Sequence, residues 1–296
     1  MIKFLVFFFI FLISSGPAFS SQETEKNSKR PILTLLLKKE PSKAIYSLEA
    51  EVRNLSLKNR KISLSFQGTL RREGELVILD IPQGITFFSP SEVKNFSFYL
   101  VYKKGILNLS YFRGEGFVIS GKISPSLSIL DLNVDIKGIR LKELNRLLGV
   151  ENFPFQGDFR GNISLKGDFK NLLIEGHLEA FGANLEDYKI ERVFLNFRGS
   201  YPWIYFSDSY ALLGELTLDL EGAFNLAKLY NLPYREDTLK KGELKELSKE
   251  EIREVTSLRG FLETPASGVF IYRLGSDSFL RFSVREEAFQ APGVKF

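Results

Sequence analysis

Histidine and cysteine, the side chains that most often carry nucleophilic or metal chemistry, are nearly absent from this sequence. The 296 residues include one histidine, His177, and no cysteine. A thiolate nucleophile, a disulfide, an iron–sulfur cluster and a histidine-rich metal site are therefore excluded. A Ser-His-Asp triad would have to use His177, which lies in the alternating segment LLIEGHLEAF. We expect this histidine on the solvent face of a strand and predict no catalytic residue and no cofactor.

Three oxygen-bearing side chains, Asp131, Asn133 and Asp135, resemble the opening of a calcium-binding loop. Such a loop needs glycine where Ile136 stands, and no glutamate follows at the right distance. The polar face of an alternating strand explains all three, so we predict no metal site. A nucleophile elbow, a phosphate-binding Walker loop and a strand-bound Gly-x-Gly-x-x-Gly are also missing from the sequence.

Aromatic residues around Trp203, in the segment SYPWIYFSDS, are the remaining candidates for ligand contact. Trp203 and Tyr205, with Tyr201 and Phe206 nearby, would form a sugar-stacking platform in a secreted carbohydrate-binding β-protein. The interpretation that we favour is core or edge packing beside Pro202.

The elements that must position these residues are short strands, because residues 46–229 alternate apolar and polar side chains over and over. The segments KISLSFQG, LDLNVDIKG, GNISLKG and GELTLDLEG each place apolar residues on one face and polar residues on the other. Strands with one wet face are typical of antiparallel sheets. We predict a mainly β fold, a long curled antiparallel sheet forming an open β-groove, with a few short inserted helices. A closed sandwich core would use the same apolar residues.

Two helices and five segments follow from the rest of the pattern. Helical leucine spacing before Gly149 predicts a helix within residues 137–149. A capping box at Ser248 and Glu251 predicts another helix that ends before Gly260. The predicted segments are a signal peptide (1–20), a linker (21–44), a repetitive β-groove domain (45–232), a charged helical insert (233–259), and C-terminal strands with a tail (260–296).

The N-terminus has the pattern of a secretory signal peptide. Lys3 precedes an apolar run over residues 4–13, and Ala18 and Ser20 occupy the small-residue positions before a cut. The prediction is export, with cleavage after Ser20; the alternative is an uncleaved inner-membrane anchor extending through Phe19. The 40 Lys+Arg and 36 Asp+Glu leave a net charge of +4, which argues against a nucleic-acid face. Lysine and glutamate richness without cysteine is a weak indication of a thermophilic source.

Residues 107–229 resemble the repeating-groove proteins of the bacterial envelope, the AsmA-like superfamily that includes the TamB and YhdP types. The segments that carry the resemblance are SGKISPSLSILDLNVDIKGIRLKELNRLLG and the stretch from FQGDFRGNISLKGDF to GELTLDLEG. Their order, a strand running into a Leu-x-x-Leu-Leu-Gly stop and then paired amphipathic strands, matches the family. Family members are usually much longer and keep an N-terminal transmembrane anchor.

The resemblance implies a non-enzymatic envelope protein whose hydrophobic β-groove binds or transfers phospholipid between the inner and outer membranes, or assists outer-membrane assembly. About fifteen strands at ~4.8 Å each span only ~70 Å, so we expect a membrane or envelope protein partner, or action as a shuttle. The runner-up is an outer-membrane β-barrel, favoured by the amphipathic strands and by Phe296 at the end of the sequence. The residues predicted to line the groove and to contact phospholipid acyl chains are Leu130, Leu132, Val134, Ile136, Ile163, Leu165, Leu172, Ile174, Leu178, Leu216, Leu218 and Leu220.

Overall fold

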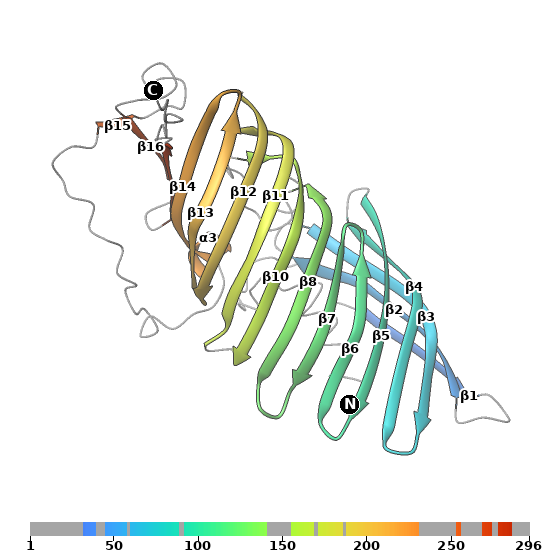
Figure 1. Cartoon of the computed structure of the whole chain (residues 1–296). Helices are drawn as coiled ribbons and strands as arrows, with labels where there is room; N and C mark the ends of the chain where they lie inside the picture. The colour runs from blue at the N-terminus through green and yellow to red at the C-terminus, as the bar shows by residue number, and fades with distance from the viewer. Residues whose placement is uncertain are drawn as a thin grey trace, which may run out of the picture.

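The residues that the structure describes form one 17-stranded sheet and one short helix (Figure 1). The computed structural model describes residues 32–39, 45–57, 60–88, 92–140, 155–168, 171–185, 188–230, 253–255, 268–273 and 278–285. The strands are β1 (Ile32–Lys39), β2 (Ile45–Leu57), β3 (Arg60–Glu73), β4 (Leu76–Phe88), β5 (Glu92–Lys103), β6 (Ile106–Gly114), β7 (Phe117–Ser124), β8 (Ile129–Arg140), β9 (Phe155–Gln156), β10 (Asp158–Asp168), β11 (Leu173–Leu185), β12 (Tyr188–Ser200), β13 (Trp203–Leu213), β14 (Leu216–Asn225), β15 (Arg253–Val255), β16 (Gly268–Arg273) and β17 (Phe279–Val284). One short helix, α3 (Leu226–Tyr230), follows β14.

The strands follow one another across the sheet as an antiparallel meander. Strands β1 to β8 pair in sequence order, β8 pairs with β10, and the order continues through β14. The chain then reverses, because β14 pairs with β17, β17 with β16, and β16 with β15, the last pair being parallel. Strand β9 lies beside β11.

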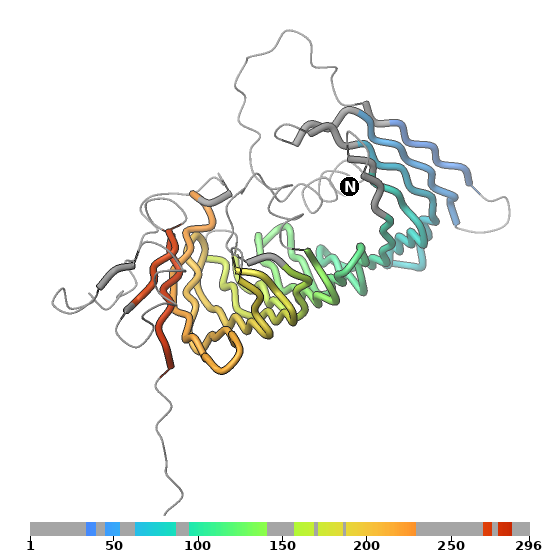
Figure 2. The backbone as a smooth tube through the Cα atoms, turned by 90° about the horizontal axis from the view of Figure 1, so that it is seen from above, coloured from blue at the N-terminus to red at the C-terminus, as the bar shows by residue number. Residues whose placement is uncertain are grey.

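The sheet is open, as predicted. Among the described residues β1 pairs only with β2 and β15 only with β16, so the sheet is not closed into a barrel. It curves along its length, so that β1–β4 lie at an angle to β10–β14 (Figure 2). This bend is in keeping with the twist that strands of L-amino acids impose on a large sheet.

Three sequence predictions need correction. The predicted linker 21–44 contains β1, whose sequence ILTLLLKK runs apolar without strict alternation. The helix predicted over 248–259 has a strand at residues 253–255, because β15 pairs with β16 and this tertiary pairing overrides local helix propensity. The alternating pattern predicts strands as far as residue 229, but the last of these strands, β14, ends at Asn225. The Asn225 side-chain Oδ1 accepts a hydrogen bond from the backbone N–H of Lys228 (3.0 Å) and so caps the helix α3. The predicted signal peptide and the helical segment 141–149 lie outside the described residues.

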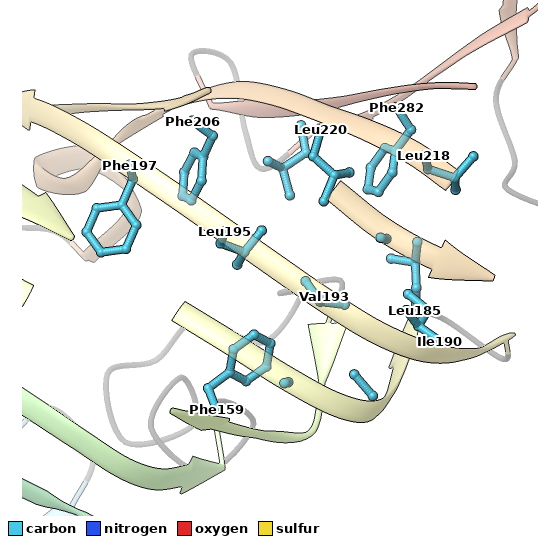
Figure 3. Packing of buried hydrophobic residues seen from close by; sticks show 14 of the residues in the cluster. Phe159, Leu185, Ile190, Val193, Leu195, Phe197, Phe206, Leu218, Leu220 and Phe282 are labelled. Atoms are coloured by element: carbon cyan, nitrogen blue, oxygen red, sulfur yellow. The ribbon is translucent and has the colours of Figure 1, made fainter. Parts of the chain in front are cut away.

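Two clusters of buried apolar side chains lie on one face of this sheet. The N-terminal cluster comes from β2 to β8 and consists of Leu48, Ala50, Val52, Leu64, Phe66, Leu79, Ile81, Phe96, Phe98, Leu100, Leu107, Leu109, Phe112, Ile123, Leu130 and Leu132. The C-terminal cluster comes from β10 to β14 with β16 and β17, and includes Phe159, Leu185, Ile190, Val193, Leu195, Phe197, Phe206, Leu218, Leu220 and Phe282 (Figure 3).

Candidate functional site

Strand register places the predicted lining residues that lie in strands on the same face of the sheet as the two clusters, which we call the apolar face. Leu172, just before β11, packs against both clusters. Leu132 in β8 opposes Leu165 in β10, and Leu165 opposes Ile174 in β11. Directly opposed residues of antiparallel strands project to the same side of a sheet. Further on, Leu218 in β14 opposes Ala211 of β13 and Val284 of β17. The face is therefore continuous from one strand to the next.

The predicted lining residues differ in how accessible they are. Half of them are buried, and Leu218 and Leu220, at 0% and 1% exposed, serve as packing in the C-terminal cluster. The buried members are Leu130, Leu132, Ile136, Ile174, Leu218 and Leu220. The partly buried members are Val134, Ile163, Leu165, Leu172, Leu178 and Leu216.

The accessible part of the apolar face lies between the two clusters. We define the central patch as the partly buried side chains of Ile119, Val134, Ile163, Leu165, Leu172 and Leu178. Ile119 opposes Val134, and Val134 opposes Ile163, so β7, β8 and β10 contribute adjacent side chains. Leu165 and Leu172 contact both clusters and join them. Ile119 was not among the predicted lining residues, because the segment FVISGKIS lacks clean alternation around it.

Two glycines let β10 and β11 approach closely beneath this patch. A Cβ atom at Gly161 would collide with the carbonyl oxygen of His177, and one at Gly176 would collide with that of Asn162. Glycine in a strand interior marks such a close backbone approach. Because Gly176 directly opposes Ile163, the patch has no side chain at that point.

The opposite face of the sheet, which we call the polar face, carries the charges. Arg192 pairs with Glu179 (Nε to Oε1, 3.2 Å), and Arg285 Nε donates to Asp219 Oδ1 (2.7 Å). The hydrogen bond to Asp219 raises the pKa of the Arg285 guanidinium above its usual value. The cross-strand neighbours of Val134 and Ile163 on the apolar face are, in contrast, isoleucine, valine or glycine. The two faces therefore separate charge from apolar surface.

His177 belongs to an aromatic column on the polar face, as its position in the alternation predicted. Its ring stacks on Phe194 (centroids 5.8 Å apart), and Phe194 stacks on Tyr210 (5.6 Å). The guanidinium groups of Arg192 and Arg285 lie 5.6 and 5.5 Å from the Tyr210 ring centroid. Such contacts stabilise neighbouring strands. No local sequence pattern indicates this column, because its members come from three separate strands.

The residues considered for calcium binding lie in strand β8, and most of those considered for sugar binding lie in strand β13. Asp131 and Asp135 lie at alternate positions of β8, and Asp131 opposes Lys122 and Lys166. Trp203 and Tyr205 stack on each other at 6.4 Å and are partly buried.

The four aromatics of the suggested sugar platform do not share one surface. Phe206 belongs to the C-terminal cluster on the apolar face, and Tyr201 packs against that cluster. In the part of the chain that the structure describes, no three His, Cys, Asp or Glu side chains come together in a way that would hold a metal ion. Within the same residues, no helix has the length and hydrophobicity needed to cross a membrane.

Comparison with models of protein families, with curated proteins and with solved structures gives no match to this chain.

Proposed function

We propose that this protein is a non-enzymatic periplasmic envelope protein that holds phospholipid acyl chains on its apolar face. In this proposal it transfers phospholipid between the inner and outer membranes or assists outer-membrane assembly. The observation that supports it best is the central patch, a partly accessible apolar surface on a continuous sheet face whose reverse side carries the charges.

The physical basis of the proposal is burial of hydrocarbon. Each CH₂ group removed from water gains ~0.8 kcal/mol, so an acyl chain laid across several strands gains binding energy without any directional contact. Ile119, Val134 and Ile163 are opposed in register and offer such a path across β7, β8 and β10. The sheet that carries this path curves along its length (Figure 2).

Native mass spectrometry of the protein purified from cell envelopes tests the proposal. We expect co-purifying phospholipid with the unchanged protein and loss of most of it with Ile163→Glu, because a carboxylate in the patch has to be desolvated against the acyl chain. The matched control is Asn162→Glu, which places the same charge on the neighbouring, exposed polar-face position of β10. Bare unchanged protein, or equal lipid loss in both variants, would contradict the proposal.

A further inference from the structure

The outer edge of β1 is a second surface that the sheet leaves open. Within the described residues β1 pairs with β2 and with no other strand. Half of the backbone N–H and C=O groups of an antiparallel edge strand point away from its neighbour and lack a ladder partner. Natural edge strands usually carry charges, proline or a bulge that blocks further pairing. In β1 the charges are confined to one end, at Lys38 and Lys39.

The middle of β1 presents leucine to solvent. Leu36 is 58% exposed and Leu37 is 42% exposed. Leu36 opposes Glu49 on the polar face, where an apolar side chain has no core to join, whereas Leu37 opposes Leu48 on the apolar face. An open backbone edge flanked by exposed leucines on both faces is the surface expected of a strand that pairs with another chain.

We propose that β1 pairs antiparallel with β1 of a second copy of this chain, about a two-fold axis that places Leu35 opposite Leu35 of the second copy. This register places Thr34 opposite Leu36 and Leu37 opposite position 33. Residues of equal parity then oppose one another, so the apolar faces of both copies lie on the same side. Leu35, which packs against the N-terminal cluster, would continue that cluster across the axis.

Charge and symmetry favour a second copy over an unrelated strand. The two-fold axis sends the Lys38 side chains to opposite ends of the ladder, ~20 Å apart along the strands, which exceeds the Debye length of ~10 Å. The lysines therefore flank the leucine centre without facing each other. An isologous contact also uses each β1 edge once and closes, so that it does not propagate into fibres.

The consequence is a longer apolar face. One 17-stranded sheet extends over about 75 Å at ~4.8 Å per strand, and two sheets joined at β1 extend over about 150 Å. Pairing at β1 does not require lipid, so the dimer and the lipid-binding function are independent and are measured separately.

Because the sequence contains no cysteine, a single introduced cysteine is the only residue that can form a disulfide in a crosslinking test. Opposed residues at the centre of an antiparallel ladder have Cα atoms about 4.5–5.5 Å apart, which is within reach of a disulfide. We expect oxidation of the Leu35→Cys protein, expressed as the full chain, to give a disulfide dimer that reductant returns to monomer. The control is Ser110→Cys, an exposed residue of β6 far from the edge. No dimer at position 35, or equal dimer at both positions, would overturn the proposal.

Sedimentation velocity on the otherwise unchanged chain gives an independent test. We expect concentration-dependent doubling of mass, and at least a tenfold weaker dimer in the Leu36→Lys variant, because this exposed position tolerates lysine in the monomer. The second-copy proposal is overturned if the chain stays monomeric at all concentrations, which includes the case in which β1 pairs only with another protein. It is also overturned if the Leu36→Lys substitution leaves the dimer unaffected. Native mass spectra of the same samples record bound lipid, so a failed dimer and a failed lipid function remain distinct results.

Discussion

The C-terminal cluster and the central patch lie side by side on the apolar face, but they differ in what they present to the surroundings. Ala180, on β11, is 1% exposed and packs in the cluster, whereas Leu178, two residues earlier on the same strand and face, is partly buried. On β8 the N-terminal cluster shows the same contrast with the patch, between Leu132, at 3% exposed, and Val134. Residue type does not explain the contrast, because all four are apolar.

The apolar face therefore performs two tasks, packing in the clusters and presenting accessible surface in the central patch. Side chains in the clusters are shielded on all sides and hold neighbouring strands together, so their removal creates cavities. Side chains in the patch keep accessible surface that a ligand can cover. Stability and ligand binding should therefore respond to different substitutions on the same face.

The largest expected effect is a cavity in a cluster. Phe98 is 0% exposed in the N-terminal cluster, and Phe98→Ala should lower the free energy of unfolding by about 3–5 kcal/mol, since it removes a fully buried ring. Val134→Ala, in the patch, should cost about 1 kcal/mol, because its side chain is only partly buried. Urea unfolding monitored by circular dichroism measures both values. If both variants lose the same free energy of unfolding, the distinction between the clusters and the central patch is wrong.

A smaller effect is expected from closing the approach between β10 and β11. Gly176→Ala should cost about 2–3 kcal/mol, because the added Cβ meets the carbonyl oxygen of Asn162 and the strands must separate. Gly74 is the matched control: its φ of 61° disfavours alanine, but nothing lies near its Cβ position. Gly74→Ala should cost only about 1 kcal/mol. If denaturant unfolding ranks the two variants in the opposite order, the close approach is not what fixes these strands.

The smallest effect belongs to an exposed ion pair on the polar face. The hydrogen bond from Arg53 (Nε to Oε1, 2.6 Å) lowers the pKa of Glu51 below its usual value. A lowered carboxyl pKa stabilises the fold above the unfolded-state pKa, and this contribution is lost as pH falls through the folded-state pKa. NMR titration should show the pKa of Glu51 rising toward its ordinary value in Arg53→Ala. Thermal stability near neutral pH should change little, since the pair is exposed. A large drop in melting temperature would contradict this assignment.

Much of the sheet could be predicted from alternation alone. LDLNVDIKG lies in β8 and LTLDLEG in β14 as expected, because period-two patterning fixes which face of a strand is apolar. Alternation does not predict the strand ILTLLLKK, since an edge strand with leucine on both faces does not alternate. Local pattern also does not predict a strand at residues 253–255, because their pairing with β16 depends on a distant part of the chain.

The candidate site could be predicted only in part. Alternation identified the face but not its accessibility, which depends on how strands far apart in sequence pack together. Leu218 and Val134 have the same pattern in the sequence, yet the neighbours from β13 and β17 bury Leu218 completely. Ile119 lies in the central patch because it opposes Val134 of β8, and no local sequence pattern indicates this pairing.

The most direct test of the account is photo-crosslinking of lipid at two adjacent positions of β8. A photoreactive amino acid placed at Val134 faces the central patch, and one placed at Asn133 lies on the polar face of the same strand. After irradiation of the protein in cell envelopes, mass spectrometry should find phospholipid adducts at position 134 and essentially none at position 133. Equal labelling at the two positions, or no lipid adduct at position 134, would contradict the claim that the apolar face of this sheet holds acyl chains.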